Sequence, residues 1–212
     1  MSTTFPADLL AGYARFTENR LGPERDRYRR LAREGQRPRT MMIACCDSRA
    51  APETIFDTGP GELFVMRNVA NLVPPYEPDG GQHATSAAIE FAVAALKVEN
   101  IVVMGHGRCG GIAASLDAGM EPLSEGDFIG KWIGLLRPMA GEVAGMDVPA
   151  DERQTHMERA SIQASIERLR GFPLVAEAER EGRLALHGGW FDIETGELWT
   201  MEADGAFARA GA

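Results

Sequence analysis

Two short apolar runs, each followed by a loop rich in metal-binding residue types, place the strongest constraint on how this chain folds. Residues 41–45 (MMIAC) and 101–104 (IVVM) have the length and the apolar character of buried strands. Residues 84–97 and 151–170 carry apolar side chains at helical spacing. Strands that alternate with helices predict an α/β fold with a mostly parallel central sheet flanked by helices.

Weaker patterns complete this outline. The sequence predicts N-terminal helices near residues 7–20 and 23–34, and further strand-like runs at 63–66, 184–193 and 197–203. Residues 84–97 are apolar on nearly all sides, so we expect this helix to be buried against the sheet or a partner subunit. Since no linker and no internal repeat is visible, we expect one domain over residues 1–212. Residues 1–39 would form a helical arm that extends from its body.

Composition and charge exclude several classes of function. The 212 residues are 44% hydrophobic and 25% charged, which is typical of a globular protein with one core. The net charge of −9 argues against a nucleic-acid partner. No apolar run approaches the roughly 18–20 residues of a membrane span, and the N-terminus does not have the pattern of a signal peptide. The three cysteines, two of them adjacent, do not suggest a disulfide framework, so we expect a cytoplasmic protein.

The two strand-like runs deliver potential metal ligands to one edge of the predicted sheet. Cys45 ends the first run, and His106 and Cys109 follow the second. Ligands of such sheets bind beyond the carboxyl ends of the strands, where both loops emerge. Two thiolates and one imidazole suit zinc better than Mg²⁺ or Ca²⁺, and three protein ligands leave a catalytic position open. Each residue alone also fits a structural role in the core, so it is their convergence that favours a metal site.

Neighbouring residues are interpreted from local geometry. Cys46 should point away from Cys45, because side chains alternate along a strand. We expect the glycines of the second loop to let its backbone turn sharply, and these are Gly105, Gly107, Gly110 and Gly111. Asp47 and Arg49, taken alone, fit a surface ion pair or a helix cap as well as a catalytic role.

Two motifs in this order resemble those of β-class carbonic anhydrases. Residues 45–49 (CCDSR) resemble the family's C-x-D-S-R, and residues 106–111 (HGRCGG) resemble its H-x-x-C-G-G. The similarity extends over about residues 40–200. It implies reversible hydration of CO₂ to bicarbonate and a proton, by attack of a zinc-bound hydroxide. It also implies one Zn²⁺ per chain, held by Cys45, His106 and Cys109, and a homodimer or homotetramer.

The resemblance assigns roles to three further residues. Arg49 would hold Asp47 by two parallel hydrogen bonds, and Asp47 would accept a proton from the zinc-bound oxygen. Released from Arg49, Asp47 would become a fourth zinc ligand and close the site. Gly110 would offer its backbone N–H to the substrate.

Several positions depart from the family pattern. Some members close by binding bicarbonate at a second site, whose three positions here carry Met42, Arg67 and Phe191. Only the arginine is retained, so we predict an open site without this regulation. Gly59 stands where plant-like members place a glutamine that donates to the bound anion. His83, in a glycine-rich loop, is a candidate proton shuttle.

Three alternative functions are compatible with parts of this pattern. An enzyme of the same fold could hydrolyse CS₂ or COS by a similar attack. A non-catalytic protein could use zinc for stability, with Asp47 as a permanent fourth ligand. A thiol redox protein could use the adjacent Cys45 and Cys46, although this leaves His106 and Cys109 unexplained.

Overall fold

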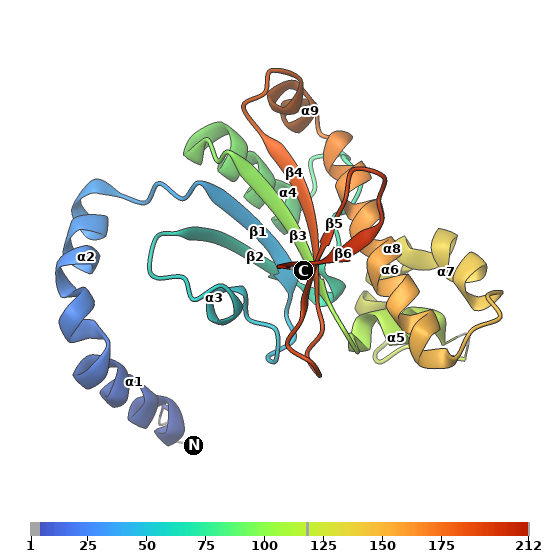
Figure 1. Ribbon diagram of the computed structural model, residues 1–212, viewed down its shortest axis with the longest axis horizontal. Coiled ribbons are helices and arrows are strands. Elements are labelled where there is room, and N and C mark those ends of the chain that lie inside the picture. Colours follow the sequence, from blue (N-terminus) through green and yellow to red (C-terminus); the bar gives the residue numbers. More distant parts are fainter. Residues whose placement is uncertain (1–4, 118, 212) are drawn as a thin grey trace. The chain divides into compact units, whose positions relative to one another are not determined.

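The computed structural model describes residues 5–117 and 119–211, and it divides into two compact units at residues 37 and 38 (Figure 1). The first unit consists of α1 (Ala7–Asn19) and α2 (Leu21–Glu34). Phe16 of α1 packs edge-on against Tyr28 of α2, with ring centroids 6.1 Å apart. Both N-terminal helices are thus where the sequence predicts them. The assignment of one domain with an arm over residues 1–39 stays a prediction.

The second unit is built on a mixed sheet. Its described residues form six strands in the order β2-β1-β3-β4-β5-β6. The first four of these are parallel: β2 (Leu63–Asn68), β1 (Thr40–Cys45), β3 (Asn100–His106) and β4 (Ala185–Phe191). The chain then returns through two antiparallel pairings, with β5 (Leu198–Met201) and β6 (Phe207–Arg209). This confirms the predicted mostly parallel sheet.

The central strand β1 shows why a continuous apolar run marks a buried strand. Its side chains alternate between two clusters of the core. Met41 and Ile43 belong to the larger cluster on one face, and Met42 and Ala44 to a smaller cluster on the other. All four are at most 3% exposed. Because both faces are covered, the strand has no polar side, as parallel strands generally lack one.

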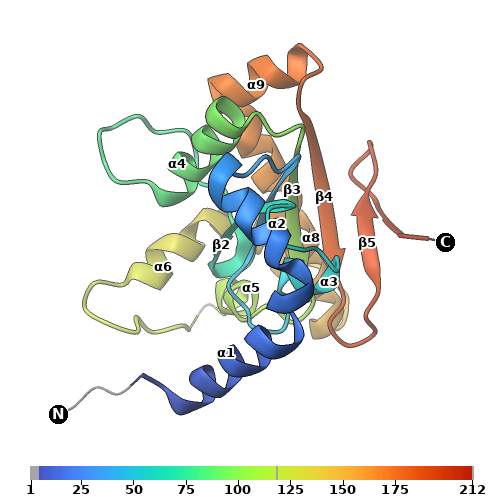
Figure 2. The same ribbon diagram turned by 90° about the vertical axis from the view of Figure 1, so that its left-hand side faces the viewer.

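Helices cover the larger cluster. The long helix α8 (Ala150–Arg170) runs alongside β3 and β4 (Figures 1 and 2). It is joined by α9 (Pro173–Arg180) and by α4 (Ala84–Glu90), which continues as the π-helix η2 (Phe91–Leu96). The opposite cluster is covered by the short α3 (Pro52–Ile55) and by Phe56 after it.

A third cluster forms beyond the carboxyl ends of the parallel strands, where their arrowheads converge in Figure 1. It contains Cys45 and Cys109 together with residues of the surrounding helices. These are η1 (Val69–Asn71), α5 (Gly110–Leu116), α6 (Phe128–Ile133), η3 (Gly134–Leu136) and α7 (Arg137–Ala144). The sequence patterns do not predict α6 or α7.

The helix expected over residues 84–97 is buried on one side only. Ile89, Ala92 and Val93 face the core, whereas Phe91 is 49% exposed on the other side. The apolar character of this segment therefore exceeds what packing within the described chain requires. Among the described residues, no helix combines the length and the apolar character needed to cross a membrane.

Adjacent glycines of β4 provide a matched test of packing. A Cβ atom added to Gly188 would lie 2.9 Å from Met201 Cβ and 3.0 Å from Ile162 Cγ2, whereas at Gly189 its nearest neighbours would be 3.9 Å away. We expect Gly188→Ala to lower the free energy of unfolding by about 1–3 kcal/mol through overpacking. Gly189→Ala should change it by less than about 0.5 kcal/mol. Urea denaturation measures both values, and equal effects would contradict this account of the sheet.

Candidate metal centre

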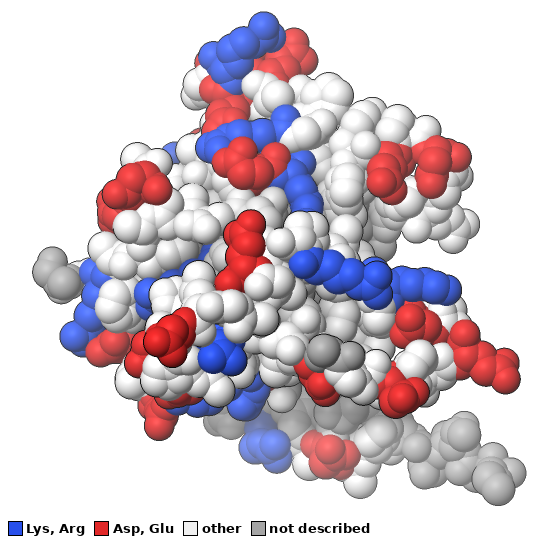
Figure 3. Space-filling view, turned by 90° about the vertical axis from the view of Figure 1, so that its right-hand side faces the viewer, with Lys and Arg blue, Asp and Glu red and all other residues white. Residues whose placement is uncertain are grey.

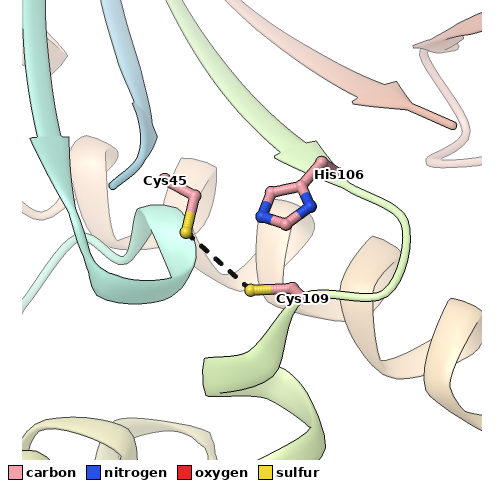
Figure 4. Close-up of side chains that lie close together, drawn as sticks. All are labelled: Cys45, His106 and Cys109. Carbon is pink, nitrogen blue, oxygen red and sulfur yellow. Dashed lines mark hydrogen bonds between the residues drawn. The ribbon is translucent and has the colours of Figure 1, made fainter. Parts of the chain in front are cut away.

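Parallel strand pairing brings the predicted ligands together. Cys45 is the last residue of β1 and His106 the last of β3, and these strands pair with Ala44 opposite Met104. Cys109 precedes the first residue of α5. Figure 4 shows the three side chains turned toward one another from these three elements.

The ligand atoms lie at distances that one metal ion can span. Cys45 Sγ and Cys109 Sγ are 3.9 Å apart, and all three potential ligand atoms lie within 4.8 Å of one another. Cys45 is 5% exposed, and His106 and Cys109 are each 1% exposed. Soft sulfur and imidazole donors in a dry setting are typical of sites for transition-metal ions.

The orientation of His106 fits metal binding. Its Nδ1 lies 2.9 Å from the Gly107 carbonyl oxygen, to which it can donate a hydrogen bond. Its Nε2 is buried and has no hydrogen-bond partner among the described residues. A buried polar atom is rarely left unpaired, and metal-bound histidines are commonly oriented by a carbonyl on their other nitrogen. The arrangement therefore presents Nε2 as a ligand.

The protonation preferences of the two thiols also suit a cation. Hydrogen bonding with the Cys109 thiol lowers the pKa of Cys45, and the Ala70 amide, 3.3 Å from Cys45 Sγ, contributes. The hydrogen bond with the Cys45 sulfur in turn raises the pKa of Cys109, and burial and the charge of that sulfur act in the same direction. Burial lowers the pKa of His106, but its interactions with Cys45 and Gly107 outweigh burial, and the net shift is upward. A divalent cation would compensate both thiolates.

Asp47 and Arg49 lie together beside the ligands. Arg49 donates from its backbone N and Nε to Asp47 Oδ1, at 3.0 and 2.9 Å, and from Nη2 to Oδ2, at 2.7 Å. These hydrogen bonds hold the pKa of Asp47 well below its usual range. Asp47 Oδ2 lies 3.8 Å from His106 Nε2. The carboxylate therefore stands next to the ligand atom of the histidine, while Arg49 Nη2 also reaches the Arg108 carbonyl at 3.2 Å.

Arg67 supports the same segment from its other side. It donates from Nε to the Cys45 carbonyl at 2.7 Å and from Nη2 to the Asp47 carbonyl at 2.6 Å. Met42, another of the three positions of the second bicarbonate site, packs with Ala44 in the smaller core cluster, on the face of the sheet that α3 covers. The retained arginine is thus engaged with backbone carbonyls.

The second loop turns for a reason other than the one expected from its glycines. The residue with a left-handed backbone is Arg108, at φ 57°, and none of Gly105, Gly107, Gly110 and Gly111 has a positive φ. Gly105 and Gly111 permit close packing instead. A Cβ at Gly105 would lie 2.8 Å from Ile162 Cδ1, and one at Gly111 would lie 2.8 Å from Val69 Cγ1. The prediction that these glycines shape the turn is therefore wrong.

Gly110 differs from its neighbours, because an added Cβ would meet no described heavy atom within 4 Å. Its predicted role as an N–H donor to substrate stays a prediction.

Cys46 is exposed, as strand alternation predicts. His83 pairs with Asp79 through Nε2 and Oδ1 at 2.7 Å, and it lines a cavity of about 460 Å³ with Met66, Val69 and Trp132. Gly59 donates its N–H to Glu62 Oε2 at 2.9 Å.

Sequence reasoning missed a buried carboxylate behind Cys109. Glu158, which is 1% exposed, accepts the Cys109 N–H at Oε1 and the Trp190 Nε1–H at Oε2, both at 3.0 Å. Burial raises its pKa, against the effect of these donors. One signal was present in the sequence. Glu158 lies four residues before Ile162 and eight before Ile166, and thus on the apolar stripe of its helix, where a charge is unusual.

Comparisons with known proteins agree with this geometry. The profile of the family described as "Carbonic anhydrase" matches residues 40–198. The chain is 40% identical over 202 residues to the chloroplastic beta carbonic anhydrase 5 of Arabidopsis thaliana, covering 92% of this chain. It spans 65% of the length of that relative.

Solved structures show the same fold. The β-carbonic anhydrase CcaA superposes with a TM-score of 0.87 at 28% identity, over 97% of this chain and 92% of that one. One of two tetrameric β-carbonic anhydrases from the ascomycete Sordaria macrospora superposes with a TM-score of 0.78 at 31% identity, over 96% and 95% of the two chains. The family match covers most of the chain and includes all three residues of the candidate metal centre. This chain therefore belongs to the carbonic anhydrase family, and within it to the β class.

Proposed function

We propose that this chain catalyses the reversible hydration of CO₂ to bicarbonate and a proton, with one Zn²⁺ held by Cys45, His106 and Cys109. Two observations carry the proposal: one ligand atom each of Cys45, His106 and Cys109 lies within 4.8 Å of the other two, and the buried Nε2 of His106 has no hydrogen-bond partner among the described residues. Names of the relatives support the reaction, since each is a β-carbonic anhydrase. Bound zinc would supply a water acidified well below the pKa of about 15.7 that bulk water has.

Asp47 would orient the attacking water. Its low pKa keeps it ionised, so it accepts hydrogen bonds and does not hold the released proton near neutral pH. Oδ1 already accepts two donors of Arg49, but Oδ2 accepts one. Oδ2 is also the oxygen that faces His106 Nε2. We therefore propose that the remaining lone pair of Asp47 Oδ2 would accept a hydrogen bond from this water and so orient it.

The arginines favour an open site without bicarbonate regulation. Arg49 engages both oxygens of Asp47, which keeps the carboxylate from serving as a fourth ligand. Arg67 is occupied by two backbone carbonyls, and the side chains of Met42 and Phe191 offer no hydrogen-bond donor. In this proposal Gly110 contributes its backbone N–H to substrate binding, and His83 remains the candidate proton shuttle.

We also propose a homo-oligomer, a dimer or a tetramer. The Sordaria relatives are described as tetrameric. Large apolar side chains are exposed in the described chain, among them Leu9 and Tyr13 of α1, Phe91 of η2 and Phe128 of α6. Exposed apolar side chains of this size commonly mark interfaces.

On the face shown in Figure 3, acidic side chains lie among the basic ones, which supports the proposal that nucleic acid is no partner. The cytoplasmic location stays a prediction.

The adjacent cysteines test the ligand assignment. Cys45→Ser should lose most of the zinc after dialysis, because it removes one of three ligands. Cys46→Ser should retain about one zinc per chain, since this side chain points to solvent. Metal content measured by atomic emission distinguishes the two. Equal zinc content in both variants would contradict the site.

Metal removal tests the reaction. Stopped-flow CO₂ hydration between about pH 6.5 and 9 should show activity that rises with pH, because the attacking species is the ionised water. The activity should vanish after chelation and return with added Zn²⁺. Activity that survives complete metal removal would contradict the proposal. Turnover of CS₂ or COS in place of CO₂ would favour a same-fold hydrolase, and a zinc-loaded but inactive protein would favour a purely structural metal.

Asp47→Asn separates an orienting role from a ligand role. We expect CO₂ hydration to fall at least about tenfold, because the amide cannot act as a purely accepting group. Zinc content should remain near that of the unaltered chain. Asp204→Asn, at an exposed turn, provides the matched control and should leave both properties unchanged. Loss of zinc from Asp47→Asn would instead identify Asp47 as a metal ligand.

A further inference from the structure

We propose that Glu158 is a positioning residue of the metal centre, whose buried carboxylate fixes the backbone at Cys109 so that the sulfur is placed before the metal binds. The inference rests on the proposed metal site, which it deepens. Neither the motifs of the sequence nor the ligand cluster includes this residue.

The contacts of Glu158 are unusual for a side chain in a helix. Three N–H groups reach its carboxylate, each at 3.0 Å: the backbone amide of Cys109 and Gln154 Nε2 at Oε1, and Trp190 Nε1 at Oε2. The first belongs to a proposed metal ligand. The other two hold the carboxylate itself in place, one from the same helix and one from β4.

Contacts of the loop extend this restraint on both sides of Cys109. The Gly107 N–H donates to the Phe191 carbonyl at 2.8 Å. The Arg108 carbonyl accepts from Arg49, and the Cys109 carbonyl accepts from Gln154 Nε2 at 3.3 Å. Glu158 accepts the hydrogen bond of the Cys109 amide. The backbone that carries the sulfur is therefore held by hydrogen bonds to β4, to Arg49 and to α8.

The loop needs such a restraint because of Arg108. Its left-handed backbone, at φ 57°, is a conformation that residues with a Cβ adopt rarely. Strain of this kind persists where the surroundings fix the conformation. The hydrogen bond from the very next residue, Cys109, to Glu158 is one that fixes it.

Stability of the helix does not explain a carboxylate at this position. Glu158 lies on the same face of α8 as Ile162 and Ile166, where an apolar side chain would pack without the cost of burying a charge. What an apolar side chain lacks is an acceptor for the Cys109 amide. Trp190, which donates to Glu158, is itself held by Arg159, whose Cζ lies 4.7 Å from the centre of its ring.

The consequence is preorganisation of the metal site. Hydrogen bonds that orient metal ligands commonly contribute 10–100-fold to metal affinity, a typical order of magnitude. Such partners usually bind the side chain of a metal ligand, such as a histidine ring. Glu158 instead binds the backbone amide of a thiolate ligand. Its loss should loosen the Cys109 sulfur while all three ligands remain.

Zinc affinity of the metal-free full chain tests the proposal without reference to CO₂. Competition with a chromophoric chelator gives the Kd for Zn²⁺. Glu158→Gln keeps the shape but turns an NH₂ group toward an N–H donor, so we expect the Kd to rise roughly 10–100-fold. Glu167→Gln, the same change at an exposed position of α8, should stay within about twofold of the unaltered chain.

The absorption spectrum of the Co²⁺-loaded protein separates positioning from general destabilisation. The sulfur-to-cobalt charge-transfer bands depend on the geometry of the cobalt–sulfur bonds, so they should shift in Glu158→Gln. Ile166→Val removes a buried methyl group from the same helix away from the loop, and it should lower stability without shifting these bands. Unchanged bands and an unchanged Kd in Glu158→Gln would overturn the proposal, as would the same changes in Ile166→Val.

A second variant keeps the proposal testable if Glu158→Gln does not fold. Gln154→Ala removes a donor to both Glu158 and Cys109 from a half-buried position, and the Kd for Zn²⁺ should rise at least about threefold. An unchanged Kd would count against the proposal. Tight zinc binding without CO₂ hydration would overturn the proposed function alone, whereas a fully active Glu158→Gln with unchanged zinc affinity would overturn the positioning role alone.

Discussion

The parallel pairing of β1 with β3 is the constraint on which the metal centre depends. With Ala44 opposite Met104, Cys45 and His106 leave the sheet at the same edge, one residue apart in register. A slip by one residue would turn every side chain of a strand to the other face, and it would carry the ligand away with the core residues. The apolar side chains that bury β1 therefore also determine where its last residue, Cys45, points. Packing of the core therefore also places the first residue of the site.

Much of this arrangement could be predicted, because its parts have strong local patterns. β1 and β3 are continuous apolar runs, and the ligands stand directly after them. Elements with weaker patterns were not predicted: α9 spans eight residues and begins with a proline, and β6 spans three. Such short segments owe their structure to neighbours that are distant in sequence. The loop of His106 and Cys109 shows a different limit, since glycine suggested a turn but close packing on Ile162 and Val69 explains Gly105 and Gly111.

Glu158 shows why a second layer of a site is harder to predict than its ligands. Cysteine and histidine are common metal ligands, so their presence in the sequence suggests metal binding. The motifs that resemble the family's also give the order in which these ligands occur. Glu158 is separated by 49 positions from the amide that it accepts, and its partner is a backbone group with no sequence signature. A charge on the apolar stripe of α8 indicates that some buried donor exists. Only the packing of α8 across β3 and β4 shows which one.

The stacking of Arg159 carries a consequence for the end of the chain. Its guanidinium carbon lies 4.7 Å from the ring centres of Trp190 and Trp199, and 5.4 Å from that of Phe207, so one cation joins β4, β5 and β6. Trp190 is also the donor that holds Glu158. This chain of contacts connects the last two strands to the carboxylate that accepts the Cys109 amide. Fraying of the β5–β6 hairpin would thus remove two of the three aromatic rings that surround the Arg159 guanidinium.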